Sequence, residues 1–326
     1  METVLADFHT HTTSSDSSRS LKELISCFLE ARMHYASITD HDTLAIYQPG
    51  VLEEAAASLG IQLETKDRRV FQITSEGHTV TLFSGVELST KYMGKNQHLV
   101  GLRMRAIDDP EDIAYLDQLR MDRKKRIEEM IQEINLKRER SEGVYAALGK
   151  RPLSVEEFYG DMGQDAMPTR LHLGVYLWRH YRFGSSARGA MQTAVNSNLE
   201  SYRFSESAMT TEDAIQFVHK YGGIAIVPHL HRQSFEDIVQ RGPAELSRAI
   251  SYLKEVTELD GIEINPSHQQ NPLYVALAEE LDLICSIGTD DHGENGPTFY
   301  RTVAQHPDRV TLERRNITRI RERLGL

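Results

Sequence analysis

Short apolar segments that end in a histidine or a carboxylate recur along this chain, and helical patterns separate most of them. The first begins at Val4 and leads into His9 and His11, which share one face because side chains at i and i+2 of an extended segment point the same way. The ends of the seven segments carry His9 and His11, His41, Glu87, His98, His229, His268, and Asp290 with His292. We interpret the segments as parallel strands in a βαβ alternation, which predicts an α/β barrel.

Local signals define several elements within this alternation. Ser20 and Glu23 have the spacing of a capping box and predict the start of a helix, and a second helical pattern runs from Thr43 to about Leu59. Residues 70–74 and 79–83 predict the two arms of a hairpin.

The strand rhythm stops at Pro110 and returns with the segment 223–229. The residues between show long helical patterns near 111–141 and 168–181. We therefore predict a barrel built from residues 1–109 and 206–326, interrupted by a helical subdomain over residues 110–205 that covers the substrate.

The composition argues against several classes of protein. A formal net charge of −11 argues against a protein that coats nucleic acid, because such proteins need a basic face to displace counterions. Only two cysteines are present, so a disulfide framework is not expected and a reducing compartment fits. The sequence shows neither a signal peptide pattern nor an apolar run as long as a membrane span, and we expect a soluble cytoplasmic protein with no membrane contact.

The residue types at the segment ends point to metal chemistry. In α/β barrels the carboxyl ends of the strands and the loops that follow them build the active site, so these side chains are expected to meet at one mouth. Imidazoles and carboxylates without cysteine suit Mn²⁺, Fe²⁺ or Zn²⁺, and one tetrahedral ion cannot use so many donors. We expect two to three divalent transition metals.

Six ordered motifs resemble those of the PHP (polymerase and histidinol phosphatase) superfamily. They are His9-Thr10-His11, Thr12-Thr13-Ser14-Ser15-Asp16, Thr39-Asp40-His41-Asp42, Gly85-Val86-Glu87, Pro228-His229 and Gly288-Thr289-Asp290-Asp291-His292. The resemblance implies a distorted (β/α)₇ TIM-like barrel that usually holds three metals. The ligands that it implies are His9, His11, Asp16, His41, Glu87, His98, His229, Asp290 and His292, with Glu87 bridging two ions. Asp40, Asp42 and Asp291 are expected to support these ligands rather than to bind metal.

A narrower resemblance is to the nucleotide-phosphatase branch, whose barrel carries a helical insertion. Arg170-Leu171-His172 looks like the Arg-Pro-His of that insertion, and Pro266-Ser267-His268 looks like its Pro-Ser-His turn. The resemblance implies that Arg170, His172 and His268 hold the phosphate.

Four of these residues also have ordinary structural interpretations. Arg170 alone can be a surface charge and His172 a helix residue, Asp16 can cap the following helix, and His98 can be a core histidine.

These observations predict a hydrolase of phosphoric monoesters. The expected substrate is a small phosphorylated molecule, a nucleotide such as AMP or a nucleoside 3′,5′-bisphosphate, with no long nucleic acid and no obligate protein partner. Our mechanistic hypothesis has a metal-bound hydroxide attacking phosphorus at a trinuclear site while His172 or His268 protonates the leaving oxygen. The alternatives are a histidinol-phosphate phosphatase, a 5′-3′ exonuclease on short RNA, and a metal-stabilised binding module without activity.

Overall fold

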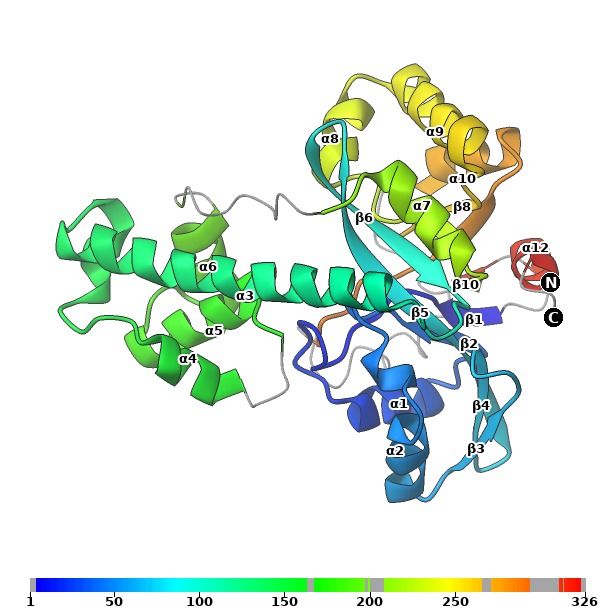
Figure 1. Cartoon of the computed structure of the whole chain (residues 1–326), viewed down its shortest axis with the longest axis horizontal. Helices are drawn as coiled ribbons and strands as arrows, with labels where there is room; N and C mark the ends of the chain where they lie inside the picture. Colours follow the sequence, from blue (N-terminus) through cyan, green and yellow to red (C-terminus); the bar gives the residue numbers. More distant parts are fainter. Residues whose placement is uncertain are drawn as a thin grey trace. The chain divides into compact units, whose positions relative to one another are not determined.

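The structure is a computed structural model, and it describes residues 4–162, 167–196, 199, 208–265, 271–293, 311–312 and 314–323 (Figure 1). Two compact units contain these residues. The first comprises Met1–Thr12, Ser17–Asp109 and Met209–Leu326, and the second comprises Thr13–Asp16 and Pro110–Ala208. Over the described ranges, no helix is both long enough and apolar enough to cross a membrane.

Seven strands of the first unit form a nearly closed barrel-shaped sheet (Figure 1). In order around the sheet they are β1 (Val4–Asp7), β2 (Tyr35–Ile38), β5 (His78–Tyr92), β6 (Lys95–Leu102), β7 (Ile224–Val227), β8 (Gly261–Ile264) and β9 (Ile284–Ile287). The two ends of this series meet, because the backbone N–H of Phe8 donates to the carbonyl of Ile287 at 2.9 Å. The fold is therefore the predicted α/β barrel.

One strand runs against the prediction. β6 pairs antiparallel with both β5 and β7, so the seven strands are not all parallel. A tight turn at Met93 and Gly94, both with positive φ, reverses the chain directly after β5. Because β6 is reversed, the beginning of this strand lies at the barrel edge where its neighbours end. His98 consequently reaches the same edge as Glu87, from the opposite chain direction.

Three further strands extend the sheet. β4 (Val70–Ser75) pairs antiparallel with β5 as the predicted hairpin, and β3 (Gln62–Thr65) pairs with β4. β10 (Thr311–Leu312) pairs antiparallel with β1. The sequence patterns indicated neither β3 nor β10.

Helices pack against the barrel, with α1 and α2 following the first two strands and α7 to α10 accompanying β7 and β8 (Figure 1). Their bounds are α1 (Leu21–Glu30), η1 (Ala45–Tyr47), α2 (Val51–Leu59), α7 (Thr211–Lys220), α8 (Gln233–Gln240), α9 (Pro243–Thr257), α10 (Asn271–Glu280) and α12 (Arg314–Arg323). The predicted capping box is present. The side-chain hydroxyl of Ser20 accepts a hydrogen bond from the backbone N–H of Glu23, and the Glu23 carboxylate accepts one from the backbone N–H of Ser20. The single helix expected from Thr43 is interrupted, because Pro49 and a left-handed Gly50 separate η1 from α2.

The second unit is helical and has its own apolar core. It contains α3 (Pro110–Glu139), η2 (Gly143–Leu148), α4 (Val155–Met162), α5 (Arg170–Tyr181), α6 (Ala187–Met191) and the short π-helix η3 (Gln192–Asn196). Buried Ile131 and Ile134 of α3 pack with Phe158 of α4 and with Leu173 and Tyr176 of α5. The two long helical patterns predicted for this region correspond to α3 and α5.

Candidate metal centre

Five histidines from different parts of the barrel face one buried carboxylate. That carboxylate is Glu87 of β5, which is fully buried. Its Oε2 lies 3.2 Å from His9 Nε2, 3.1 Å from His11 Nε2 and 3.1 Å from His41 Nδ1. Its Oε1 lies 2.7 Å from His98 Nδ1 and 3.1 Å from His229 Nε2. The structure thus brings together six of the nine predicted ligands, namely Glu87 and the five histidines around it.

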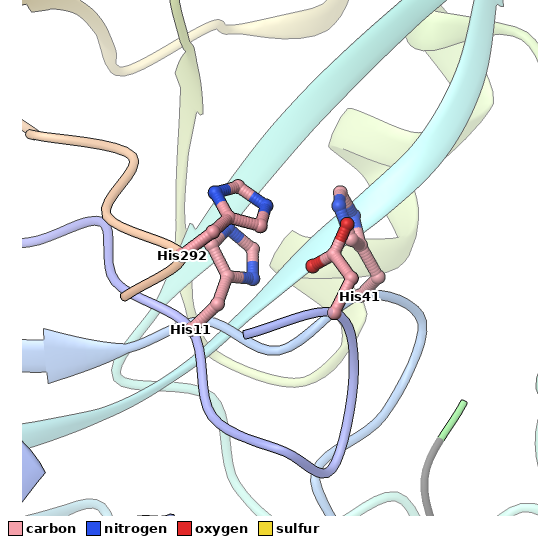
Figure 2. A group of neighbouring side chains, drawn as sticks. His11, His41 and His292 are labelled. Atoms are coloured by element: carbon pink, nitrogen blue, oxygen red, sulfur yellow. The ribbon is translucent and has the colours of Figure 1, made fainter. Parts of the chain in front are cut away.

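Asp290 and His292 complete this cluster from the loop after β9. Asp290 Oδ1 lies 3.3 Å from His11 Nε2 and 3.5 Å from His9 Nε2. The ring of His292 stacks on that of His11, with centroids 4.3 Å apart. Figure 2 shows His292 and His11 side by side with His41 facing them.

Local backbone geometry aims these side chains. His229 and Asp290 adopt positive φ values of 33° and 55°, a region that residues other than glycine rarely adopt. Such strain persists where the surrounding structure holds it and is common at functional sites. Gly85 permits the close approach of β2 and β5, because a Cβ at this position would lie 2.8 Å from Thr39 Cγ2. These backbone features help to bring the donor side chains close together.

The donors fit a cluster of metal ions. Three groups of side chains have donor atoms that lie within 4.8 Å of one another. The first group contains His9, His11, Glu87 and Asp290, and the second contains His41, Glu87 and His98. The third group includes His11, His41 and His292. Glu87 belongs to two groups, as a bridging carboxylate must. Buried His229 Nδ1 has no hydrogen-bond partner among the residues that the structure describes. Nitrogen and oxygen donors without sulfur suit divalent transition metals.

The electrostatics of the cluster favour metal-binding protonation states at two residues. Burial opposes ionisation of Glu87, but His98, His41 and His9 outweigh it and hold the pKa of this carboxyl well below its usual range. Burial is also the largest influence on His98 and lowers its pKa to about 4 despite the neighbouring Glu87. The lowered pKa favours the neutral form of the His98 imidazole, which is the form that binds metal.

A second layer of carboxylates holds the loops that carry these ligands. Asp40 accepts from the backbone N–H and the hydroxyl of Thr12, both at 2.7 Å. Asp42 binds the N–H and hydroxyl of Ser89 in the same way, at 2.7 and 2.8 Å. These hydrogen bonds agree with the supporting role expected of Asp40 and Asp42.

Two more aspartates also tie loops of the cluster together. Asp7 accepts from the N–H of His9 at 3.2 Å and from the N–H and hydroxyl of Thr289 at 3.1 and 2.7 Å. Asp291 forms a buried ion pair with Arg19 at 3.0 Å. This ion pair agrees with the supporting role expected of Asp291.

Sequence reasoning missed two residues beside the cluster. Glu263 of β8 is buried, and its Oε2 lies 2.8 Å from His9 Nδ1. Arg232 donates to Asp290 Oδ2 at 2.9 Å, and its side chain is 53% exposed. Glu263 lies near the end of the apolar strand β8, and Arg232 follows His229 by three residues. The sequence therefore contained a signal for both residues.

The remaining predicted residues belong to the second unit or lie outside the residues that the structure describes. Arg170 and His172 belong to α5 of the second unit, where the hydroxyl of Thr169 accepts from the backbone of His172 at 3.4 Å. Asp16 belongs to the segment Thr13–Asp16, which groups with that unit, and Ser20 rather than Asp16 caps α1. His268 lies outside the described residues. The roles of these four residues stay predictions.

Comparison with known proteins identifies relatives that align over most of both chains. No family model matches the sequence. A 5′-3′ exoribonuclease of Haemophilus influenzae is 27% identical over 88% of this chain and 89% of its own length. The 5′-3′ exoribonuclease Rnm of Escherichia coli is 26% identical over 89% of this chain and 85% of its own length.

Solved structures share the fold. A Bifidobacterium adolescentis protein described as a metal-dependent phosphoesterase superposes with a TM-score of 0.69 at 18% identity, covering 98% of this chain and 96% of that protein. An amidohydrolase from Chromobacterium violaceum, solved with bound sulfate and without metal, gives a TM-score of 0.62 at 21% identity over 89% and 88% of the two chains. The barrel agrees with the fold of these structures, and the ordered motifs and the converging histidines agree with the resemblance to the PHP superfamily of metal-dependent phosphoesterases.

Proposed function

We propose that this protein is a metal-dependent phosphoesterase that releases nucleotides from the 5′ end of short RNA. The observation that carries the proposal is the similarity to two proteins named 5′-3′ exoribonuclease, each aligned over more than four fifths of both chains. The buried cluster around Glu87 supplies donors for the metal ions that such chemistry uses. This proposal takes up the alternative of a 5′-3′ exonuclease on short RNA in place of the small nucleotide that the sequence favoured as substrate.

The charge of the chain limits the length of RNA rather than excluding it. A net charge of −11 provides little attraction for many backbone phosphates. A short oligomer needs few such contacts, since the metal ions neutralise the phosphate that reacts. We therefore place the substrate among oligomers of a few nucleotides.

The residues of the barrel have distinct parts in this scheme. When bound, the metal ions neutralise phosphoryl charge and lower the pKa of water, which is the chemistry that phosphate ester hydrolysis requires. Glu87 and Asp290 would hold the ions, and His98 would contribute an imidazole lone pair. We assign Arg232 a contact to a non-bridging phosphate oxygen, because its exposed guanidinium already lies against Asp290.

The residues predicted from the helical insertion enter as proposals. Arg170 is proposed to bind the phosphate, and His172 or His268 to donate a proton to the departing oxygen. Asp16 is proposed as a further metal ligand. Residues 110–205 are proposed to cover the substrate and set its size.

A phosphatase of small nucleotides is the second candidate. The resemblance of Arg170-Leu171-His172 to the nucleotide-phosphatase branch favours it, together with the net negative charge. AMP and nucleoside 3′,5′-bisphosphates are the substrates to compare with RNA.

The test is a direct comparison of products. Oligoribonucleotides of three to ten residues, 5′-phosphorylated or 5′-hydroxyl and labelled at the 3′ end, are incubated with metal-loaded protein beside AMP and a nucleoside bisphosphate. We expect stepwise shortening from the 5′ end with release of mononucleotides, and none with the folded Asp290→Asn variant. Faster release of inorganic phosphate from the small nucleotides contradicts the proposal and supports the second candidate. Inactivity on every substrate refutes both.

A further inference from the structure

We propose that Glu263 is a positioning residue that fixes which nitrogen of His9 binds metal. The inference deepens the metal site of the proposed function and rests on it only for the presence of metal ions. It is carried by contacts within the barrel unit. Glu263 lies on β8, 254 positions from His9 in sequence, and both side chains are buried.

The two nitrogens of His9 face different partners. Nδ1 lies 2.8 Å from Glu263 Oε2, whereas Nε2 lies 3.2 Å from Glu87 Oε2 and 3.5 Å from Asp290 Oδ1. An ionised carboxylate only accepts hydrogen bonds, so Glu263 requires a proton on Nδ1. With a proton on Nδ1, the nitrogen left to bind a metal ion is Nε2, which faces the cluster. Carboxylates that hold metal-binding histidines in this way also raise their basicity as ligands.

The second oxygen of Glu263 has a separate task. Oε1 accepts from the backbone N–H of His229 at 3.3 Å, at a residue whose positive φ needs outside support. One carboxylate therefore ties a ligand on the loop after β1 to the backbone of a ligand after β7. Both contacts require an acceptor. A glutamine offers one acceptor and one donor, so it cannot replace Glu263 at both contacts.

The contact between Glu263 and His9 needs the space beside Gly288, which has no side chain. A Cβ built on Gly288 would overlap Glu263 Oε2 and lie 2.5 Å from His9 Cβ. The φ of Gly288 is not positive, so alanine is compatible with the backbone and the conflict is one of space alone. Gly288→Ala therefore disturbs the same pair without removing any polar group.

The matched control is Asp260, which directly precedes β8. This carboxylate is also buried, and its Oδ2 accepts a hydrogen bond from the backbone N–H of Ala225 at 2.8 Å. The same oxygen lies 2.8 Å from His219 Nε2. It has no part in the cluster described above. Asp260→Asn imposes the same acceptor-to-donor change on the same segment.

The experiment measures metal binding without any substrate. Co²⁺ is titrated into metal-free wild type, Glu263→Gln, Gly288→Ala and Asp260→Asn in competition with a chromophoric chelator. We expect the dissociation constant to rise by about 10- to 100-fold in Glu263→Gln, in the same direction in Gly288→Ala, and not to change in Asp260→Asn. Phosphoesterase activity of Glu263→Gln should recover at high metal concentration, which a merely structural defect would not allow.

Two results would overturn the proposal. One is a folded Glu263→Gln variant that binds Co²⁺ as wild type does. The other needs no variant of Glu263 and so applies even if that variant fails to fold. In a long-range ¹H–¹⁵N spectrum of Zn²⁺-loaded wild type, with the His9 signals assigned from their loss in His9→Gln, we expect a protonated Nδ1 and a metal-bound Nε2. Metal on Nδ1 of His9 refutes the assignment, whatever substrate the enzyme proves to cleave.

Discussion

Replacing Glu87 by glutamine tests the organisation of the metal centre most severely. The variant keeps the shape of the side chain but removes a charge that faces five imidazoles at 2.7 to 3.2 Å. Two of the three donor groups contain Glu87, whereas the group of His11, His41 and His292 does not. We therefore expect Glu87→Gln to lose metal from two groups and to retain it in the third.

The expected loss of rate follows from the chemistry of the lost ions. Stabilisation of transition-state charge by bound metal contributes several kcal/mol, and about 1.4 kcal/mol corresponds to a factor of ten. The rate of phosphoester cleavage should thus fall by on the order of 10³-fold. The assay combines elemental analysis after desalting with single-turnover kinetics, and exposed Glu64→Gln on β3 is the control. Wild-type metal content and rate in folded Glu87→Gln would refute the bridging role.

Four further substitutions address the phosphate contacts, a pH-dependent ion pair and a helix cap. Arg170→Ala and Arg232→Ala should each lower kcat/KM by on the order of 10²-fold with unchanged metal content, and wild-type kinetics in either removes that residue from the proposed site. The hydrogen bond to Asp260 raises the pKa of His219 above its usual 6.5, so the stability that the pair contributes is fully present below pH 6.5 and is lost as pH rises through the raised value. The difference in unfolding free energy between wild type and His219→Gln should accordingly shrink on going from pH 6 to 9 in urea titrations, and a constant or growing difference contradicts this. Ser20→Ala should cost about 1 kcal/mol of unfolding free energy through loss of the capping box, and an unchanged denaturation midpoint would show that the cap contributes nothing.

Most of the site could be predicted because most of its residues follow apolar strands. Glu87 was expected at a strand end but lies within β5, which continues to Tyr92 and pairs there with β6. His9 and His11, Glu87 and Asp290 follow short apolar runs, and a barrel brings the ends of such runs to one edge. Their identity as ligands came from residue type and motif order rather than from any contact. The structure adds that Glu87 is the common neighbour of the five histidines.

Other features could not be predicted from periodicity. An apolar strand has the same pattern in either direction, so the reversal of β6 depended on the short turn at Met93 and Gly94. The contact between His9 and Glu263 joins residues far apart in sequence and leaves no local pattern. The helix predicted from Thr43 is interrupted at Gly50 by a left-handed backbone conformation. The helical spacing of apolar residues on both sides of Gly50 gave no sign of this interruption.

The most direct test of the metal centre is an anomalous difference map. Crystals of the protein loaded with Mn²⁺ are measured on both sides of the manganese absorption edge. The arrangement of donors predicts peaks on both sides of the Glu87 carboxylate, one among His9, His11 and Asp290 and one between His41 and His98. A map without a peak within bonding distance of Glu87 would contradict the assignment of this cluster as the metal centre.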